Sequence, residues 1–438
     1  MKTLRASDPG FDAGLKAMLS AKRAASVDVR EAVSGILADV EKNGDAALIA
    51  LTSRFDGFDL TPETLRVPPA DLERAAACCA PETLAALKAA AARIADFHKK
   101  QIPADLDYVD SQGVRLGLRW KPMASAGLYV PGGLASYPSS VLMNAIPAKT
   151  AGVKRLVMAS PTPGGDANPL VLAAAHVAGV DEVYRIGGAQ AIAALAYGSQ
   201  TITPVDMIAG PGNAYVAEAK RQVFGTVGID MIAGPSEILV VADNLNAPSW
   251  IAADLLSQAE HAAAAQAILI TDDADFADAV GAEAERILDQ SPRAGIARES
   301  WRNNGCVIIV EDLAAAPAVI DLIDLIDAIA PEHLELAVDN AEALAGKVNN
   351  AGAIFLGRLT PEAIGDYVAG PSHVLPTAQS ARFSSGLGVI DFMKRSSLIG
   401  CGADSLQAIG PDAVILAQAE GMDAHALSVS LRLGEENT

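Results

Sequence analysis

Arg155-Leu-Val-Met-Ala159 is an apolar run that opens the stretch of sequence deciding the fold. The run predicts a β-strand, and the alanine-rich segment Pro169–Ala178 predicts the helix after it. The alternation continues with a strand at Glu182–Ile186 and a helix at Ala189–Tyr197. Strand, helix and strand at this spacing form βαβ units, whose strands lie parallel in one sheet. The middle of the chain therefore predicts an α/β fold.

The same alternation extends on the carboxyl side of this stretch. The further predicted elements are a strand at Asp206–Ile208, a helix at Ala214–Phe224, a strand at Ile238–Ala242, a helix at Trp250–Ala263, a strand at Ala267–Thr271, a helix at Phe276–Asp289 and a strand at Val307–Val310. The first hundred or so residues look helical instead, with amphipathic stretches at Val29–Asn43 and Pro81–Lys99.

These elements predict two parallel-sheet, incompletely Rossmann-like domains, the second inserted in the first, with small helical segments at both ends. The predicted boundaries are 1–25 for an N-terminal helical arm, 26–128 with 238–380 for the first α/β domain, 129–237 for the second and 381–438 for the C-terminal segment. No low-complexity linker separates these parts, which favours an insertion over a chain of separate domains.

Composition excludes several classes of protein. The chain has 438 residues, of which 51% are apolar and 4% aromatic, which suits helices of small side chains packed on parallel sheets. The net charge of −20 disfavours nucleic acid and anionic membranes as partners, although acidity also simply keeps a protein soluble. The four cysteines form no C-x-x-C pair, and the sequence shows neither a signal peptide nor a membrane-spanning run. We expect a soluble cytoplasmic protein.

Two strings of sequence echo one another, Val205-Asp-Met-Ile-Ala-Gly-Pro-Gly212 and Ile229-Asp-Met-Ile-Ala-Gly-Pro-Ser236. Each reads as an apolar strand that runs into a Gly-Pro turn. Such turns lie at the carboxyl ends of strands, where α/β proteins bind ligands. Two ordinary strand exits would also explain the match, but the shared Asp-Met-Ile-Ala-Gly-Pro string favours related units.

The widespread nucleotide-binding and hydrolase motifs are absent from the sequence. There is no G-x-G-x-x-G after a strand, no Walker A, no G-x-S-x-G and no H-E-x-x-H. Glycines cluster instead at Pro131-Gly-Gly133, Gly187-Gly188 and Gly210-Pro-Gly212. Turns of this kind can bring backbone N–H groups to a pyrophosphate, but each taken singly is more often a plain tight turn.

Three of the six histidines stand beside an amide or a carboxylate at a useful spacing. In Asp254-Leu-Leu-Ser-Gln-Ala-Glu-His261, positions 254, 258 and 261 share one face of a helix, so Gln258 and His261 could bind one metal ion. An exposed polar stripe is the ordinary alternative. The adjacent Glu332 and His333 could supply two proton-transfer groups, or form a buried hydrogen-bonded pair without chemistry.

The third pair is Glu420 and His425, close to the C-terminus. Gly421 is expected to break the helix between them and to let both side chains turn towards one site, although a solvated helix end is the alternative. Together these groups offer nitrogen and oxygen donors but no thiolate. Such a donor set suits zinc, with manganese or cobalt as substitutes.

The other three histidines are interpreted by their neighbours. His98 precedes two lysines and reads as a surface residue, whereas His176 lies on an apolar helix and reads as a core residue. His373 lies in a loop with special turn chemistry, from which it could approach a ligand.

Ten strings stand in a fixed order from about residue 120 to the last helix. They are Gly127-Leu-Tyr-Val-Pro-Gly-Gly133, Tyr137-Pro-Ser-Ser-Val-Leu-Met-Asn-Ala-Ile-Pro-Ala-Lys149, Gly187-Gly-Ala-Gln-Ala-Ile-Ala-Ala-Leu195, Gly210-Pro-Gly-Asn213, Ala233-Gly-Pro-Ser-Glu237, Leu256-Ser-Gln-Ala-Glu-His261, Ala330-Pro-Glu-His-Leu-Glu335, Gly370-Pro-Ser-His-Val-Leu-Pro376, Arg382-Phe-Ser-Ser-Gly386 and Glu420-Gly-Met-Asp-Ala-His425. With these strings in its order, the chain closely resembles the histidinol dehydrogenase family. The first hundred residues carry little of the resemblance.

The resemblance implies roles for particular residues. The implied metal ligands are Gln258, His261, Asp366 and His425, and the implied acid/base pair is Glu332 and His333. The implied NAD contacts are Tyr129, Gln190 and Asn213, in a domain 129–237 that would bind the cofactor. The implied substrate contacts are Ser236 and Glu420, together with His333 and the metal ligands. Two departures from the family pattern are Leu134, which could alter the cofactor turn, and Ala262-Ala263, which should only trim polarity at a helix end.

The activity that the resemblance implies is the oxidation of L-histidinol through L-histidinaldehyde to L-histidine, the final steps of histidine biosynthesis, with two NAD in sequence and zinc. Zinc would bind the imidazole and amine of the substrate, His333 would take the alcohol proton, and Glu332 would activate water to attack the aldehyde. A homodimer with shared active sites is also implied, in which segment 381–438 serves dimerisation and Glu420 and His425 act across the interface.

Three other functions compete with this interpretation. A related zinc- and NAD-dependent dehydrogenase for another small alcohol, such as sulfopropanediol, would keep the metal site, but Tyr137-Pro-Ser-Ser140 and Glu420 favour histidinol. A zinc hydrolase would use Glu332 to activate water but would leave the implied NAD contacts without a purpose. A binding module without catalysis would show no turnover.

Overall fold

The computed structural model describes residues 2–24, 29–132, 137–313 and 316–434, and these form two parallel sheets and a smaller antiparallel one. The six-stranded parallel sheet contains, from edge to edge, β1 Lys2–Arg5, β11 Cys306–Ile309, β10 Gln266–Thr271, β9 Glu237–Ala242, β12 His333–Ala337 and β13 Ala353–Leu356. The five-stranded parallel sheet contains β6 Glu182–Tyr184, β5 Arg155–Ala159, β4 Ser125–Tyr129, β7 Met207–Ala209 and β8 Gly228–Ile229.

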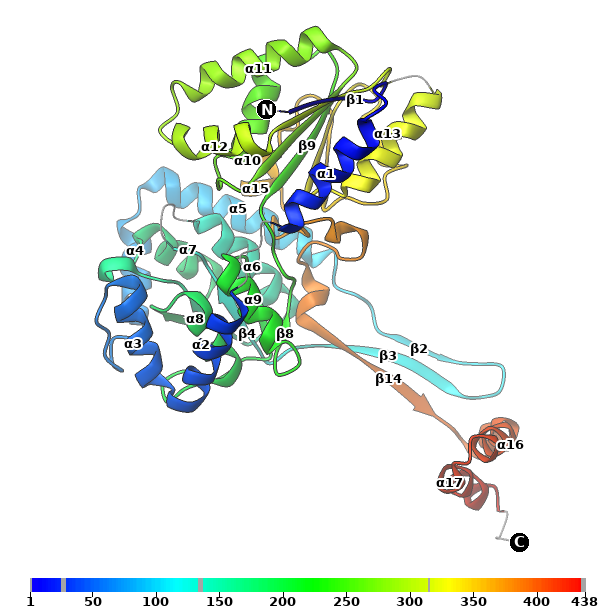
Figure 1. Ribbon diagram of the computed structural model, residues 1–438. Coiled ribbons are helices and arrows are strands. Elements are labelled where there is room, and N and C mark those ends of the chain that lie inside the picture. The colour runs from blue at the N-terminus through cyan, green and yellow to red at the C-terminus, as the bar shows by residue number, and fades with distance from the viewer. Residues whose placement is uncertain (1, 25–28, 133–136, 314–315, 435–438) are drawn as a thin grey trace.

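Helices cover both faces of the six-stranded sheet (Figure 1). Because successive strand residues point to opposite faces, Leu239 and Val241 pack in one layer and Ile238 and Val240 in the other. The first layer is closed by α1 Phe11–Ala24, α13 Ala316–Ile329 and α14 Ala341–Ala345. The second is closed by α10 Pro248–Ala259, α11 Ala274–Leu288 and α12 Ala294–Asn304.

The five-stranded sheet is covered in the same way, and most of the N-terminal helices belong to it. One face packs against α4 Pro69–Cys78, α5 Pro81–Lys99, α6 Pro138–Ala151 and α7 Pro169–Ala178. The other face packs against α2 Arg30–Asn43, α3 Asp45–Asp56, α8 Gly188–Tyr197 and α9 Ala214–Val223. Local signals fix these helices: α7, for example, begins where the Asn168 side chain accepts from two backbone N–H groups and ends at the left-handed Gly179.

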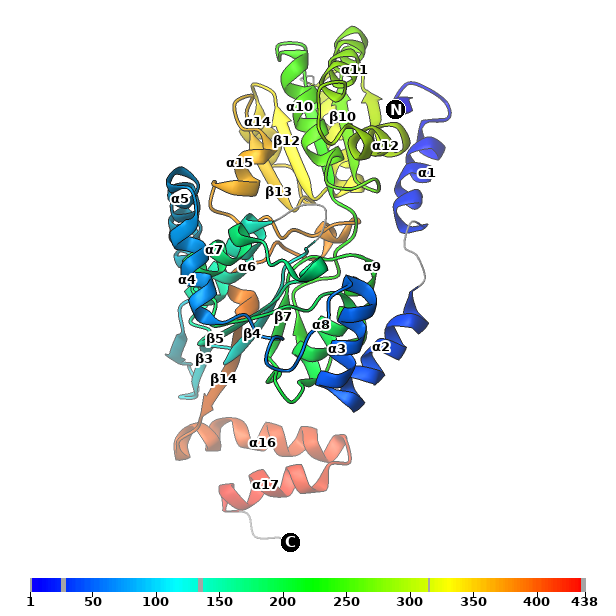
Figure 2. The ribbon, with the colours of Figure 1, turned by 90° about the vertical axis from the view of Figure 1, so that its left-hand side faces the viewer.

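The C-terminal part of the chain extends away from the two sheets (Figures 1 and 2). Strand β14 Met393–Gly400 pairs antiparallel with β3 Arg115–Pro122, which pairs with β2 Leu106–Val109. This ribbon carries two helices, α16 Ala403–Ala419 and α17 Asp423–Leu433, which pack on each other. The remaining short elements are α15 Glu362–Tyr367 and the 3₁₀ turns Pro163–Gly165, Ser380–Arg382 and Val389–Phe392.

The predicted fold class of two parallel-sheet domains is confirmed, and the chain does leave the six-stranded sheet after α1 and return to it at β9. The predicted boundaries grouped residues 26–128 with 238–380, whereas the helices between residues 30 and 99 pack on the five-stranded sheet. We therefore propose that the inserted unit runs from about residue 29 to the end of β8. Among the described residues, no helix is long and apolar enough to cross a membrane.

Three sequence interpretations are corrected by the structure. The second of the two echoing strings is not a strand that runs into a Gly-Pro turn, because β8 ends at its first residue, Ile229, and residues 230–236 connect the two sheets. His98 is fully buried rather than on the surface, and His176 is exposed rather than in the core. Helix α10 ends at Ala259, so the shared helix face of the Asp254–His261 segment stops short of its histidine.

Candidate active site

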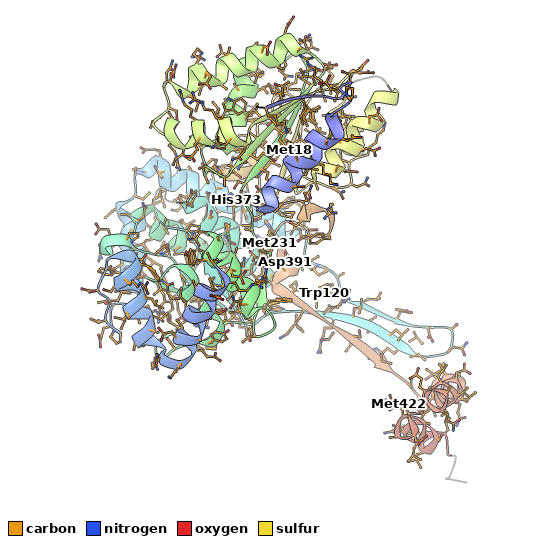
Figure 3. The ribbon with its side chains drawn as sticks, viewed as in Figure 1. Met18, Trp120, Met231, His373, Asp391 and Met422 are labelled. Carbon is orange, nitrogen blue, oxygen red and sulfur yellow. The ribbon has the colours of Figure 1, made fainter. Side chains whose placement is uncertain are left out.

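The predicted acid/base and cofactor residues lie towards the junction of the two α/β units, where Figure 3 shows His373. His333 is the first residue of β12 and pairs in register with Ile238 near the start of β9, so the acid/base pair lies at the amino ends of these strands. Tyr129 is the last residue of β4, so the cofactor residues lie at the carboxyl end of the five-stranded sheet. Ligands of α/β proteins are expected at the carboxyl ends of the strands, so the cofactor residues lie at the expected position and the acid/base pair does not.

The buried ring of His333 has two nitrogens in different surroundings. Nδ1 lies 2.9 Å from the backbone oxygen of Glu237. Because a carbonyl oxygen only accepts, the neutral ring carries its proton on Nδ1 and its lone pair on Nε2. Nε2 has no hydrogen-bond partner among the described residues and lies 3.5 Å from Oε1 of Glu362. Burial lowers the pKa of His333 against the opposing charge of Asp366, so the ring is available as a neutral base.

Glu332 is buried beside His333 and is held by one strand neighbour. The Glu237 N–H donates to its Oε2 at 2.8 Å. Burial raises the pKa of Glu332 well above its usual range; the Glu237 N–H lowers it, and the nearby carboxylates of Glu237, Asp366 and Glu362 raise it further. A carboxylate with a raised pKa is a stronger base, which is what activation of water requires.

Asp366 on α15 is oriented by His373, the loop histidine. Nδ1 of His373 lies 3.1 Å from the backbone oxygen of Asp366 and 3.6 Å from its Oδ1, while Nε2 lies 3.2 Å from Oγ of Ser140 on α6. Burial alone would raise the pKa of Asp366, but the hydrogen bond with His373 and the imidazoles of His373, His333 and His261 hold it well below its usual range. Asp366 therefore stays ionised and suits a cation.

Gln258 and His261 lie at and just after the end of α10, on the side of the six-stranded sheet. Gln258 is fully buried, and neither Oε1 nor Nε2 of its amide has a hydrogen-bond partner among the described residues. An unpartnered buried amide costs about 1–3 kcal/mol, so this side chain fits a site in which its oxygen binds a cation. Burial lowers the pKa of His261, which keeps the ring in the neutral form that binds metals. The charge of Asp366 acts against this shift in the pKa of His261.

One acidic residue of the site was not predicted from the sequence. Ligand atoms of Glu362, His333 and Asp366 lie within 4.8 Å of one another, which makes this trio a group able to hold a cation. Ser257 Oγ donates to Oε2 of Glu362 at 3.2 Å. Burial and the charge of Asp366 raise the pKa of Glu362 to about 9. The available signal was two carboxylates four residues apart on a short helix, which places them on one face.

Asp254 does not join this group, although it shares a helix with Gln258. Its side chain interacts with that of Glu335 on β12, which also accepts a 3.3 Å hydrogen bond from the Glu362 N–H. Burial raises the pKa of Glu335 to about 9 and that of Asp254 to about 6. The two carboxyl groups therefore share a proton instead of forming a charged pair.

The predicted cofactor residues come together around the end of β4. The Tyr129 hydroxyl accepts from the Gly188 N–H at 3.1 Å, and burial raises the pKa of Tyr129 to about 12, so the phenol stays neutral. Gln190 follows two residues later in the first turn of α8 and is buried. Asn213 caps α9, because its Oδ1 accepts from the backbone N–H groups of the second and third residues after it. Gly210 packs its backbone directly on Tyr129.

The remaining predicted residues lie at two other places. Ser236 is partly buried just before β9, and its backbone oxygen accepts from Gln266 at 2.9 Å. Glu420 and His425 are exposed around the junction of α16 and α17, where Gly421 breaks the helix as predicted. Figure 3 shows Met422, which lies between them in the sequence, far from His373. Within the single chain, the charge of Asp366 acts on His261, and the His261 N–H donates to the backbone oxygen of Gln258, whereas His425 lies on α17.

The structure describes only one of the two departures from the family pattern. Leu134 lies outside the described residues. Ala262 and Ala263 lie in the turn after α10, where the backbone oxygen of Ala262 accepts from Ala265 and that of Ala263 from the Asn304 side chain. The alanine pair takes part in these bonds only through its backbone.

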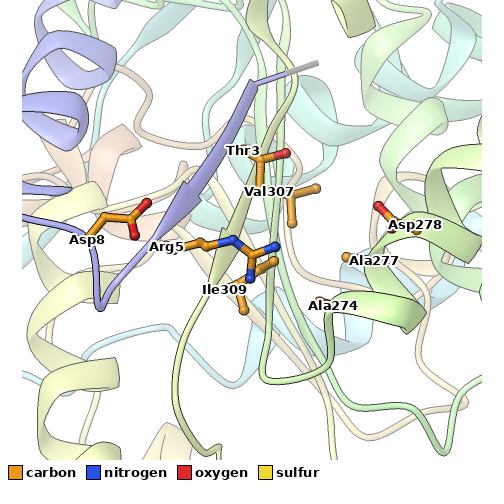
Figure 4. Close-up of a pocket in the computed structure, with 8 residues that line it drawn as sticks. All are labelled: Thr3, Arg5, Asp8, Ala274, Ala277, Asp278, Val307 and Ile309. Atoms are coloured by element: carbon orange, nitrogen blue, oxygen red, sulfur yellow. The ribbon is translucent and has the colours of Figure 1, made fainter. Parts of the chain in front are cut away.

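A separate hollow lies at the β1 edge of the six-stranded sheet (Figure 4). Arg5 reaches into it between Asp8 and Asp278 of α11. This edge is the opposite one from β12 and β13, and none of the predicted site residues borders the hollow.

The fold and the site define an α/β enzyme in which a buried imidazole and carboxyl group stand beside nitrogen and oxygen metal donors. The histidinol dehydrogenase family model matches residues 19–433. The histidinol dehydrogenase of Rhodospirillum rubrum is 62% identical over 431 residues, and that of Rhizobium meliloti is 59% identical, each alignment covering 98% of both chains. The crystal structure of histidinol dehydrogenase from Elizabethkingia anophelis superposes with a TM-score of 0.91 at 35% identity, over 100% of this chain and 99% of that one. The chain belongs to the histidinol dehydrogenase family and is an oxidoreductase.

Proposed function

We propose that the protein oxidises L-histidinol through L-histidinaldehyde to L-histidine, with two NAD consumed in sequence and zinc as its metal. The substrate is taken from the names of the relatives. The observation that carries the proposal is the buried Glu332–His333 pair with a free Nε2 lone pair, and the unpartnered buried amide of Gln258 supports the metal. The hydrolase interpretation uses the same groups but gives the cofactor residues no role.

Three residues of one chain would hold the metal, namely Gln258, His261 and Asp366. The fourth would be His425 of the partner subunit, because the His425 of the same chain lies on the projecting α16–α17 pair. When bound, zinc supplies a positive charge that orients the nitrogen groups of the substrate. Ser236 and the partner's Glu420 would contact the substrate, the latter through its charged amine or imidazole.

His333 would act as the base for the alcohol. Its Nε2 lone pair would take the hydroxyl proton while hydride passes from the same carbon to the nicotinamide of NAD. The Glu237 oxygen holds the protonated Nδ1 and so keeps Nε2 aimed at the site. Tyr129, Gln190 and Asn213 would hold the cofactor across the junction between the two units.

Glu332 would serve the second oxidation. Its carboxylate would take a proton from water as the water adds to the aldehyde, which creates an alcohol-like carbon from which a second hydride can leave. The Glu237 N–H fixes one carboxylate oxygen, so the other is left for water. Because the aldehyde is reactive, retaining it in a closed site between the steps protects it.

We also propose a homodimer in the cytoplasm. The α16–α17 pair exposes apolar side chains such as Ile415, Leu416 and Leu431, which a second subunit would cover.

The first test is the yield of NADH from histidinol. Zinc-loaded protein with excess NAD is expected to form two NADH per histidinol at completion. A chelator should abolish the reaction, and added zinc should restore it. A yield of one would refute the second oxidation. Zero yield from folded, zinc-loaded dimer would refute the proposal, and product formation independent of NAD would favour a hydrolase.

A further inference from the structure

A buried ion pair lies beside the proposed cofactor site, and the mechanism above does not use it. Lys220 on α9 and Asp230, at the start of the linker between the sheets, pair with side chains that are only 2% and 1% exposed. Burying both charges removes them from water, and such pairs often contribute little to stability compared with apolar replacements. Their use must therefore be sought in what they hold in place.

Both charged groups bind the backbone of the same residue, Gly210, one through its N–H and the other through its C=O. The Gly210 N–H donates to Oδ2 of Asp230 at 2.8 Å, and the Lys220 ammonium donates to the Gly210 oxygen at 3.1 Å. The pair thus clamps Gly210 from both sides. Charge-assisted hydrogen bonds of this kind are stronger than neutral ones and are weakened little by solvent when buried.

The loop of residues 210–213, here called the cofactor loop, turns at Gly210. Its φ is +115°, and a Cβ there would lie 2.2 Å from the backbone oxygen of Tyr129, so the loop meets β4 backbone to backbone. Asn213 follows three residues later and caps α9, the helix that carries Lys220. The clamp therefore sets the position of two proposed NAD contacts relative to each other.

The same pair also anchors the linker. Asp230 Oδ1 accepts from the Met231 N–H at 2.6 Å, and the Asp230 N–H donates to the oxygen of Ile208 on β7 at 3.1 Å. The linker then runs through Gly234, whose N–H donates to Thr377, to Ser236 and β9. The ion pair therefore fixes the start of the linker to the cofactor loop, while the end nearer the proposed substrate contact is held separately through Thr377.

We propose that Lys220 and Asp230 are positioning residues for the cofactor, which hold the Gly210 loop in the arrangement that binds NAD. This inference rests on the proposed function, because it assumes that Tyr129 and Asn213 contact NAD. It predicts that the pair contributes to the binding of NAD and not to the binding of histidinol or to folding.

The test replaces the pair by apolar side chains, Lys220→Met with Asp230→Leu. We expect folded protein whose KM for NAD and whose Kd for NADH, followed by NADH fluorescence, both rise about tenfold, because the loop loses its fixed position. The kcat at saturating NAD and the KM for histidinol are expected to stay within about twofold. A second pair, Lys220→Gln with Asp230→Asn, keeps neutral donors and acceptors for Gly210 and should restore most of the NADH affinity.

The matched control is the ion pair Arg155–Glu182, at the amino ends of β5 and β6, far along the sheet from the cofactor loop. Arg155→Met with Glu182→Gln should leave the NADH affinity unchanged. Wild-type NADH affinity in the folded Lys220→Met, Asp230→Leu protein would overturn the inference. Should that pair not fold, Lys220→Gln with Asp230→Ala removes the acceptor for the N–H groups of Gly210 and Met231 and gives the same comparison. Absence of NADH binding in the wild type would instead refute the proposed function.

Discussion

The amide of Gln258 illustrates how one residue reveals a site. A side chain that is fully buried without a hydrogen-bond partner among the described residues destabilises the fold unless something else binds it. We predict that Gln258→Leu, of similar size, stabilises the metal-free protein by about 1 kcal/mol but weakens zinc binding at least about tenfold. Urea unfolding in chelator and zinc titration measure the two effects. A variant that is less stable without metal, or that binds zinc normally, would contradict the assignment.

Glu332 and His333 are adjacent in the sequence but are predicted to act in different steps. In Glu332→Gln the amide oxygen can still accept from the Glu237 N–H, so the local structure is retained, but the side chain cannot take a proton from water. We expect the NADH yield to fall from two towards one per histidinol, with aldehyde as the product. His333→Gln should lose the first NADH as well, by about 10²-fold or more in rate. Equal loss of both oxidations in Glu332→Gln would refute the division of labour.

His98 gives a prediction about pH. Burial lowers its pKa below the ordinary value of 6.5, although its contact with the Ile94 oxygen opposes the shift. In the unfolded chain the His98 imidazole therefore binds a proton near pH 6.5, whereas in the folded chain it is still neutral at that pH. This residue thus lowers the free energy of unfolding as the pH falls through that value. In His98→Gln the loss of unfolding free energy between pH 8 and 5.5 should be smaller by about 1 kcal/mol. The exposed His176→Gln is the control and should behave as the wild type.

Sequence reasoning at this scale singled out residues whose partners are close in the chain. Glu332, His333 and the Gln258–His261 spacing drew notice from their own neighbours. Glu362 did not, because its importance comes from the approach of β12 to α15, which no local pattern encodes. His98 and His176 were wrongly placed for the same reason: the polarity of flanking residues does not reveal which face of a helix a neighbouring helix covers.

At the scale of elements, the α16–α17 pair is the part of the molecule that most needs a partner. Ile415 and Leu416 are 61% and 63% exposed on α16, at the end of a ribbon that projects from the body. We predict that Ile415→Asp with Leu416→Asp shifts the protein from dimer to monomer, because charged groups cannot be covered by an apolar surface without cost. Analytical ultracentrifugation measures the mass. Leu359→Asp, at a residue 82% exposed before α15, is the control and should leave the dimer intact.

The elements themselves were predictable in unequal measure. Strand β5 and helix α7 have the predicted bounds, because an apolar run ended by turn residues specifies a buried strand or helix almost alone. The ribbon of β2, β3 and β14 was missed. Both of its faces are largely exposed, so it lacks the periodic pattern of a half-buried strand, and its pairing joins segments from distant parts of the chain.

At the scale of the whole molecule, the sequence predicted two units and an insertion but misassigned helices α2 to α5. The pattern of an amphipathic helix predicts which face is buried but not the sheet against which that face packs. The two sheets offer apolar surfaces of similar composition, so this choice depends on packing and chain connection. The predicted dimer with shared sites is likewise a property of the assembly, and it is best tested on the assembly.

If each active site takes Gln258 from one subunit and His425 from the other, two inactive variants should complement one another. Gln258→Leu and His425→Ala are each expected to be inactive alone. In a mixed dimer, one site carries both defects and the other carries none. When the two chains are refolded together in equal amounts, half of the dimers are mixed, so about a quarter of the wild-type activity should return. Separately refolded samples combined without subunit exchange are the control. No recovery, with mixed dimers shown by differently tagged chains, would mean that each site is built from a single chain.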